Sequence, residues 1–358
     1  MLNRRTLIGA AMVSPLAPLH AQAGQQPLKY LQIGVGHPHA NKIKVYDENP
    51  DWEVVGIVEE DPKLLSRAKE SETYNKFPFL SLEEGLNTPG LSVVGVETEI
   101  RDLLKYATQA VDAGFHVHLD KPAGSDLPAY ENLMEKADAA GLVIQMGYMY
   151  RHNPAVLMLH RMLKAGWLGE VFETHAVMSK VIPNSSRQVL DEFKGGTMFE
   201  LGGHIIDLTV GVLGQPQSVM AYPRRTLETG GDTLVDNMLA VFEYPKATAT
   251  VRSTGLEVEG FGRRHFTVCG TEGTCHIQPL DRPKMKLSLS RERKIEESGE
   301  VYRKGTTEIS FEPPYRRYVG DAAQLAAIVR GELDNPYPSS HDLAVQRAIL
   351  EASDMIKA

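Results

Sequence analysis

Apolar and polar positions follow one rhythm from about residue 27 to residue 148. Short apolar runs rich in β-branched residues alternate with segments whose apolar residues have helical spacing. The runs LKYLQIGVG, WEVVGIVEED and LSVVGVET have the length of buried parallel strands, and HVHLDKP and LVIQMGY follow helical segments in the same way. This alternation predicts a doubly wound parallel sheet with right-handed crossovers, the architecture of a nucleotide-binding Rossmann domain.

The rhythm changes near residue 149. A helix followed by a strand is predicted in MLHRMLKAGWLGEVFETHAVMS, and several short strands separated by Gly and Pro follow from Ser218 to about Ser290. Two amphipathic helical segments then close the chain. The pattern predicts a second, α+β domain over 149–358 with a large, mostly antiparallel, open-faced sheet.

The first 23 residues have a different composition. Arg4 and Arg5 precede a short apolar run, Leu7 to Val13, and a small-residue cleavage pattern at Ala21 to Ala23 follows. This arrangement is typical of a twin-arginine export signal, although a leader with chance arginines would look similar. The apolar run is too short for a membrane span, which needs about 20 residues. We therefore expect a periplasmic or otherwise exported protein with no membrane span, and we exclude residues 1–23 from the fold.

Charge and cysteine content restrict the partners and the chemistry. Removing the two leader arginines takes the formal charge from −8 to −10, because the leader has no acidic residue. Such an acidic balance argues against nucleic-acid binding and leaves small molecules or proteins as partners. Cys269 and Cys275 flank a Gly-rich turn, where a disulfide is conceivable but two free thiols are the simpler interpretation.

The segment GVGHPH lies between a predicted strand and a predicted helix, the context of a dinucleotide-binding loop. Gly34 would form the tight turn and Gly36 would let the backbone approach a pyrophosphate, while His39 replaces the third glycine. Glu59 ends the next strand, where an acid binds ribose hydroxyls and favours NAD over NADP. His37 and His39 could contact the phosphate or the nicotinamide, or could be loop histidines hydrogen-bonded to water.

In GGTMFELGGHIIDL, a helix would place Glu200, His204 and Asp207 on one face, at i, i+4 and i+7. A polar helix face with a satisfied histidine would also explain this spacing.

These segments carry a family resemblance. HVHLDKPAG, IQMGYMYRHNPAVLMLHRMLKAGWLGEV and GGTMFELGGHIIDL together resemble the glucose-fructose oxidoreductase / inositol dehydrogenase / rhizopine-catabolism (Gfo/Idh/MocA) family, from about Leu28 to about Ser353. The resemblance implies a Rossmann domain and an open-faced mixed sheet, a bound NAD or NADP, and substrates that are sugars, polyols or their derivatives. It also implies a homo-oligomer, a dimer or a tetramer.

The resemblance also implies roles for individual residues. The family's Glu-Lys-Pro motif corresponds here to Asp120, Lys121 and Pro122, which would adjoin the cofactor, with Lys121 as the catalytic lysine. The family's Asp and His pair corresponds to Glu200 and His204. His204 would accept the proton of a secondary hydroxyl, Lys121 would stabilise the developing alkoxide, and Glu200 would orient the imidazole or keep Lys121 charged.

Four further residues are expected on the substrate side: Tyr148, Tyr150, Arg151 and Asp207. Packing is an equally good explanation for each tyrosine. The histidines and acids could also ligate a metal, but without distances the sequence leads us to assign none.

Three departures from the family pattern leave the reaction open. Glu200 replaces an aspartate, the segment after the strand ending near Thr98 reads ETEIRD, and the Gly-rich loop carries histidines. We expect an NAD(P)-dependent oxidoreductase with a tightly bound cofactor, since an exported protein has little free nicotinamide around it. A redox-neutral, NAD-dependent glycoside-cleaving enzyme and a non-catalytic ligand-binding module are the alternatives.

Overall fold

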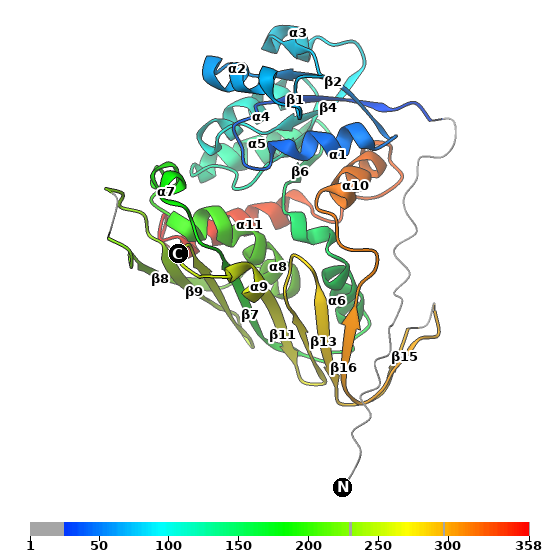
Figure 1. Cartoon of the computed structure of the whole chain (residues 1–358). Helices are drawn as coiled ribbons and strands as arrows, with labels where there is room; N and C mark the ends of the chain where they lie inside the picture. Colours follow the sequence, from blue (N-terminus) through cyan, green and yellow to red (C-terminus); the bar gives the residue numbers. More distant parts are fainter. Residues whose placement is uncertain (1–24, 229–230, 296–297, 358) are drawn as a thin grey trace. The chain divides into compact units, whose positions relative to one another are not determined.

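The structure is a computed structural model that describes residues 25–228, 231–295 and 298–357. The expected export signal at 1–23 lies outside these residues. The described chain forms two compact units (Figure 1). One contains residues 25–149 and Tyr318–Arg347, and the other contains Tyr150–Arg317 and residues 348–357. Among the helices described, none combines the length and the hydrophobicity needed to cross a bilayer.

The first unit contains a six-stranded sheet in the order β3-β2-β1-β4-β5-β6, with every pair of neighbours parallel. This is the doubly wound order predicted from the sequence, and it confirms the Rossmann fold. The strands are β1 Leu28–Ile33, β2 Trp52–Val58, β3 Phe79–Leu80, β4 Leu91–Val96, β5 His116–Leu119 and β6 Ile144–Met146. The helices between them are α1 Ile43–Glu48, α2 Pro62–Glu70, α3 Leu82–Leu86, α4 Leu103–Asp112 and α5 Leu127–Ala139, preceded by short 3-10 turns at Ala40–Lys42 and Ile100–Asp102.

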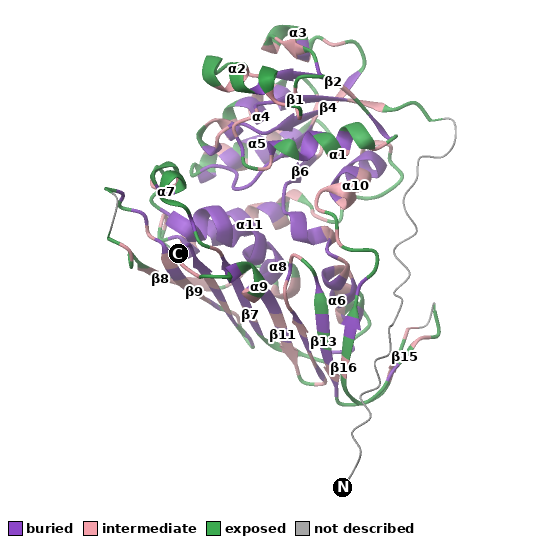
Figure 2. Ribbon diagram, viewed as in Figure 1, coloured by how far each residue is buried: buried purple, intermediate pink, exposed green. Residues whose placement is uncertain are grey.

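Local sequence explains why these elements begin where they do. Asp61 caps α2 by accepting from the backbone N–H groups of its second and third residues, and Pro62 occupies the first helical position. Asp126 caps α5 in a similar way. The central strands are buried because helices cover both faces of the sheet, whereas α2 is largely exposed (Figure 2).

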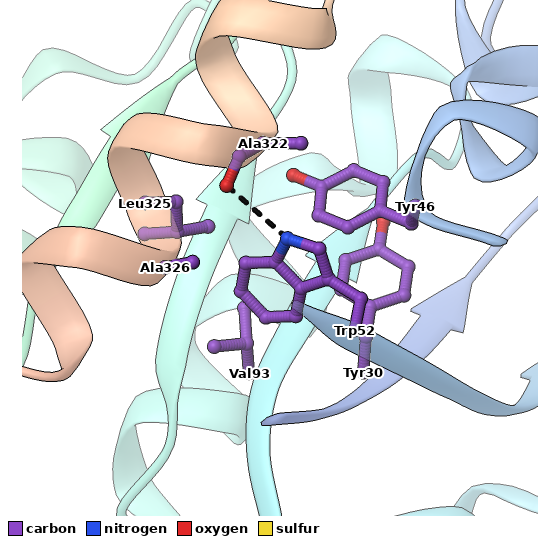
Figure 3. Packing of buried hydrophobic residues seen from close by; sticks show 7 residues of the cluster. All are labelled: Tyr30, Tyr46, Trp52, Val93, Ala322, Leu325 and Ala326. Carbon is purple, nitrogen blue, oxygen red and sulfur yellow. Dashed lines mark hydrogen bonds between the residues drawn. The ribbon is translucent and has the colours of Figure 1, made fainter. Parts of the chain in front are cut away.

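One segment belongs to a different unit from the one that the sequence suggested. We expected 149–358 to form one domain, but α10 (Val319–Val329) packs in the first unit (Figure 3). The indole N–H of Trp52 donates to the carbonyl oxygen of Ala322 at 3.1 Å, and Leu325 packs in the same cluster. Tyr30 and Tyr46 complete this aromatic cluster, with ring centroids 3.9 Å apart. Helical spacing reveals an apolar face, but it does not say which surface will cover that face.

The second unit is built on an eight-stranded sheet in the order β16-β13-β12-β11-β7-β10-β9-β8. Only β7 and β10 pair in parallel, so the predicted mostly antiparallel sheet is confirmed. The strands are β7 Val171–Ser179, β8 Ser218–Arg224, β9 Asn237–Glu243, β10 Thr248–Thr254, β11 His265–Gly270, β12 Gly273–Ile277, β13 Lys284–Leu289 and β16 Gly305–Ser310, with a separate pair of β14 Arg293–Lys294 and β15 Val301–Tyr302.

Helices of the second unit are α6 Pro154–Lys164, α7 Asn184–Leu190, α8 Gly203–Leu213 and α9 Gly260–Arg263, while α11 Ser339–Ala352 ends in this unit. The expected single helix around His204 is interrupted, because Met198–Gly202 forms a π-helical turn before α8. Glu200 therefore lies in the wider turn, and the simple i, i+4 geometry does not apply to it.

The two cysteines are free thiols. In the β11–β12 ladder Cys269 faces Thr274, whereas Cys275 faces Val268, so the two thiols occupy neighbouring rungs and are not directly opposed.

Candidate active site

The Gly-rich loop leaves the carboxyl end of β1, where the strand order changes direction between β1 and β4. Gly34 has a φ of +90°, and a Cβ there would lie 2.6 Å from Thr98 in the loop after β4. Only glycine fits both constraints without strain. The side-chain amide of Gln32 in β1 donates to the carbonyl oxygens of Gly34 at 3.0 Å and Ala40 at 3.2 Å. These two hydrogen bonds hold both ends of the Gly-rich loop against the strand. Gly34 therefore has the conformation that the predicted tight turn needs, and its approach to a cofactor stays a prediction.

A cavity of about 270 Å³ lies at this end of the sheet. Glu59 lines it, and both of its carboxylate oxygens are held by backbone N–H groups, from Val35 at 2.9 Å and from Asp61 at 2.9 Å. Partial burial raises the pKa of Glu59, which these two hydrogen bonds oppose. A carboxylate held in this way can still accept from the two hydroxyls of a ribose, since each oxygen has a second lone pair. Most other charged side chains of the lining are acidic: Glu60, Asp61, Glu99 and Asp102, with Arg101 the exception.

A second, deeply buried group of polar side chains surrounds Asp120 at the end of β5. We call it the Asp120 cluster; its members are His37, His39, Lys42, Glu97, His118 and Asp120, all in the first unit. Lys42 Nζ lies 2.6 Å from Asp120 Oδ2 and 2.9 Å from Glu97 Oε1, with its side chain fully buried. The ring of Tyr318 faces the same ammonium, whose Nζ lies 5.2 Å from the ring centroid.

The charges of this cluster depend on one another. Burial favours a neutral amine, but the facing carboxylates of Asp120 and Glu97 outweigh it and raise the pKa of Lys42. Burial and the neighbouring Asp120 carboxylate raise the pKa of Glu97 well above its usual value. Asp120 is also buried, yet His37 and Lys42 hold its pKa well below the usual range. Lys42 and Asp120 therefore form a buried ion pair, with Glu97 as a carboxyl group that binds its proton more tightly.

His118 is held as one neutral tautomer. Lys42 can only donate, so the contact of 2.9 Å between its Nζ and His118 Nε2 makes that nitrogen the acceptor. His118 Nδ1–H then donates to Gln145 Oε1 at 2.9 Å. Burial, followed by the charge of Lys42, lowers the pKa of His118 to about 3. Burial likewise lowers the pKa of His39 to about 4.

Lys121 and Pro122 follow directly, and the peptide bond between them is cis. The Lys121 side chain is buried, and its backbone N–H donates to Asp120 Oδ1 at 2.6 Å. Its carbonyl oxygen accepts from His37 Nε2 at 3.1 Å. The structure thus brings Asp120, Lys121, His37 and His39 together at the carboxyl edge of the first unit's sheet, and their contact with a cofactor stays a prediction.

The predicted site residues of the second unit are buried as well. Glu200, His204 and Asp207 are each less than 10% exposed. Arg151 holds Asp207 in a bidentate ion pair, with Nη2 2.6 Å and Nε 3.1 Å from its carboxylate oxygens. The ring of Tyr150 meets that of His204 edge to face at 5.7 Å. Tyr148 is buried in the first unit.

Sequence reasoning missed three members of the Asp120 cluster: Lys42, Glu97 and His118. Two of them, Glu97 and His118, could have been found from the sequence. Each is an ionisable residue at the end of, or inside, an otherwise apolar strand, in VVGVE and HVHLD respectively. Lys42 carried no such signal, since a lysine at the start of a helix is usually solvent-exposed.

A doubly wound sheet with this Gly-rich loop, followed in the chain by an α+β domain, is typical of two-domain NAD(P)-binding oxidoreductases. Residues 28–148 match the model described as an oxidoreductase family with an NAD-binding Rossmann fold, and residues 156–276 match the GFO/IDH/MocA C-terminal domain. These matches cover more than half of the chain. The protein belongs to the Gfo/Idh/MocA family of oxidoreductases.

Individual relatives are distant. The uncharacterized oxidoreductase YdgJ of Escherichia coli K12 is 24% identical over 317 residues, which is 83% of this chain and 89% of YdgJ. The scyllo-inositol 2-dehydrogenase (NADP(+)) IolW of Bacillus subtilis is 26% identical over 142 residues, 39% of this chain and 40% of IolW. The WlbA dehydrogenase of Bordetella pertussis, solved with NADH and UDP-GlcNAcA, has a TM-score of 0.70 at 17% identity and covers 92% of this chain and 97% of its own. This last similarity shows that the two proteins share a fold.

Proposed function

We propose that the protein oxidises a secondary hydroxyl of a sugar, a polyol or a derivative, with a tightly held NAD as its cofactor. The observation that carries the proposal is the cavity at the carboxyl end of the first unit's sheet, lined by Gly34 and by a Glu59 held in place by two backbone donors. Relatives named as inositol and dihydrobenzenediol dehydrogenases support the substrate class.

The charge of the cavity lining supports NAD over NADP as the proposed cofactor. Glu59 would accept hydrogen bonds from the adenosine ribose, and the acidic lining would repel a 2′-phosphate. Arg101, the cation of the lining, pairs with Glu99 and is thereby partly neutralised. IolW is named for NADP, so cofactor preference differs within the family and must be measured for this chain.

The proposed chemistry assigns one task to each residue. Bound NAD would supply the hydride acceptor for oxidation of the substrate's carbinol carbon. His204 would take the hydroxyl proton, since an imidazole is suited to proton transfer near neutral pH. Lys121 would stabilise the developing alkoxide charge, and Glu200 would orient the imidazole. Tyr150 would hold the His204 ring through their edge-to-face contact.

Export would explain why the cofactor should be tightly held. We propose that residues 1–23 direct the folded protein out of the cytoplasm by the twin-arginine route, with the cofactor already bound. Replacing Arg4 and Arg5 by lysine should retain the protein in the cytoplasm, as judged by fractionation of cells that express the full chain. Unchanged export of this variant would contradict the proposed route.

The cofactor proposal is tested by denaturing the purified mature protein and identifying any released nucleotide, with its redox state, by mass spectrometry. We expect close to one NAD(H) per chain. Lys121→Ala and His204→Ala should then keep the nucleotide but lose sugar-dependent reduction of it. Release of an aglycone from glycosides without net NADH would instead favour the redox-neutral cleaving enzyme. A protein that neither carries nor binds NAD or NADP would overturn the proposal and leave a ligand-binding module.

A further inference from the structure

His37 is a buried histidine of the Gly-rich loop, and the chemistry proposed above gives it no task. Its backbone N–H donates to the carbonyl oxygen of Glu97 at 2.9 Å, and its own carbonyl oxygen accepts from the N–H of Ala40 at 3.0 Å. These bonds tie the middle of the loop to the residue that follows β4 and to the turn that follows the loop. The position of the His37 ring is therefore set by the first unit's sheet.

Both ring nitrogens of His37 have partners inside the first unit. The carbonyl oxygen of Lys121 can only accept, so its contact of 3.1 Å with Nε2 places a proton on that nitrogen. Nδ1 faces the backbone N–H of His39 at 3.2 Å and Asp120 Oδ2 at 3.3 Å. With its nitrogens engaged in this way, the ring is not placed to bind a phosphate or a nicotinamide, the contacts that the sequence had left open.

The bond to Lys121 is one half of a clamp on that residue. On the other side, the Lys121 N–H donates to Asp120 Oδ1 at 2.6 Å, and Lys42 holds the second oxygen of the same carboxylate at 2.6 Å. A peptide group is planar, so each hydrogen bond fixes the plane of one of the two peptide groups that flank the Lys121 Cα. Together the two planes set φ and ψ of Lys121, and with them the direction of its Cα–Cβ bond.

We propose that His37 is a positioning residue that links the Gly-rich loop to the Lys121 peptide, aims the Lys121 side chain and couples its position to nucleotide binding at the loop. The proposal rests on the proposed function, because it takes Lys121 as the catalytic lysine and the loop as the nucleotide site. Hydrogen bonds run without a break from the loop to the lysine, which gives the coupling a physical route. Such coupling is reciprocal, so a change at Lys121 must also affect the loop.

Two substitutions of His37 separate the bond to Lys121 from the other contacts of the ring. Glutamine carries an amide N–H close to the position of Nε2, so His37→Gln should keep the donor to the Lys121 carbonyl oxygen. Asparagine is one methylene shorter, so in His37→Asn the side chain can still meet the His39 N–H but cannot reach Lys121. His276→Asn, which changes a half-buried histidine of β12 in the second unit, is the matched control.

The first measurement needs no nucleotide. The mature protein, freed of any nucleotide, is treated with acetic anhydride, and the acetylation of each lysine is followed by peptide mass spectrometry. Lys121 is 1% exposed and should react slowly in the parent. We expect His37→Asn to speed its acetylation about tenfold, and His37→Gln and His276→Asn to stay within about twofold of the parent. Lys42 is equally buried and should stay protected in every variant, because Asp120 and Glu97 hold it without His37.

The second measurement tests the coupling, with NADH as the probe and its fluorescence as the signal. We expect His37→Asn to weaken NADH binding about tenfold and His37→Gln to bind NADH as the parent does. In a Lys121→Ala background, the same His37→Asn change should weaken binding less than about threefold, because the side chain through which it acts is gone.

Several results would overturn the proposal. They are unchanged Lys121 acetylation in His37→Asn, an equal effect of His37→Gln and His37→Asn, and acetylation of Lys42 that rises together with that of Lys121. Equal losses of NADH affinity in the two backgrounds would also overturn it, since His37 would then act on the nucleotide without Lys121. A parent that binds neither NADH nor NADPH would refute the proposed function, whereas the acetylation rates would still decide whether His37 holds Lys121.

Discussion

Lys42 offers the sharpest test of how the first unit is held together. Its side chain is fully buried, and Nζ contacts Asp120 Oδ2 at 2.6 Å, Glu97 Oε1 at 2.9 Å and His118 Nε2 at 2.9 Å. Lys42→Met keeps most of the volume but removes the charge and three contacts. Breaking a buried ion pair from one side costs about 3–5 kcal/mol, because the partner charge is left without compensation. Glu97 can stay protonated and therefore neutral. We expect the loss of stability to come mainly from the Asp120 carboxylate, which would be left without its buried counter-charge.

The assay exploits the two tryptophans, which lie in different units. Trp52 belongs to the first unit and Trp167 to the second, so a Trp167→Phe background reports the first unit alone. Urea unfolding followed by Trp52 fluorescence should show Lys42→Met to be about 3–5 kcal/mol less stable than this background. The control is Lys246→Met, because Lys246 makes an exposed pair with Glu170 at 2.8 Å and such pairs contribute about 0–1 kcal/mol.

A double-mutant cycle isolates the ion pair. Asp120→Asn removes the carboxylate, so adding Lys42→Met to that variant should cost much less than it does in the parent. Equal costs in the two backgrounds, or a loss for Lys42→Met no larger than for Lys246→Met, would show that the buried ammonium is not compensated as the distances imply.

Four further predictions concern pH, cofactor choice, the second unit and assembly. The pKa of His118 is lowered to about 3 and that of His39 to about 4, so the unfolded chain binds more protons below pH 6.5. Stability should therefore fall as the pH drops from about 6.5 towards 4, by up to about 1.4 kcal/mol per pH unit for each histidine, and His118→Gln should flatten this slope in urea titrations. Glu59→Gln should lower the preference for NAD over NADP by about tenfold in binding titrations, and an unchanged ratio would contradict its assigned role. Arg151→Met should destabilise the second unit by about 3–5 kcal/mol, because it leaves the Asp207 carboxylate buried, and a melting temperature equal to that of the parent would refute this. Light scattering should find a dimer or a tetramer, and a clean monomer would refute that expectation.

Some of the candidate site could be predicted from local sequence. Gly34 ends an apolar run and precedes a helical segment, and a strand that turns there requires a residue free to adopt a positive φ. Glu59 could be predicted in the same way, since an acid at the end of the second strand lies at the sheet edge shared by all parallel strands. The roles assigned to Lys121, Glu200 and His204 remain predictions.

Other parts of the site depend on contacts between distant segments. The Asp120 cluster joins residues from the loop after β1, the end of β4 and the end of β5, and the membership of Lys42 depends on which way its short turn faces. Helical spacing in the segment around Glu200 predicted one continuous helix, but the π-helical turn at Met198–Gly202 changes where its side chains point. The π-helical turn packs against β7 and β10, which come from other parts of the chain, and the spacing of its own apolar residues does not predict it.

By itself, then, the sequence determined the order and type of the elements, because the alternation of apolar runs and helical spacing is a local property of the chain. It also determined the Gly-rich loop and the acid after the second strand. Only the tertiary structure decided that α10 covers Trp52 in the first unit and that Lys42 lies between two buried carboxyl groups. In both cases an apolar face or a buried charge is covered by residues that lie far away in the sequence, because leaving it uncovered would cost free energy. No local pattern specifies which distant residues will cover it.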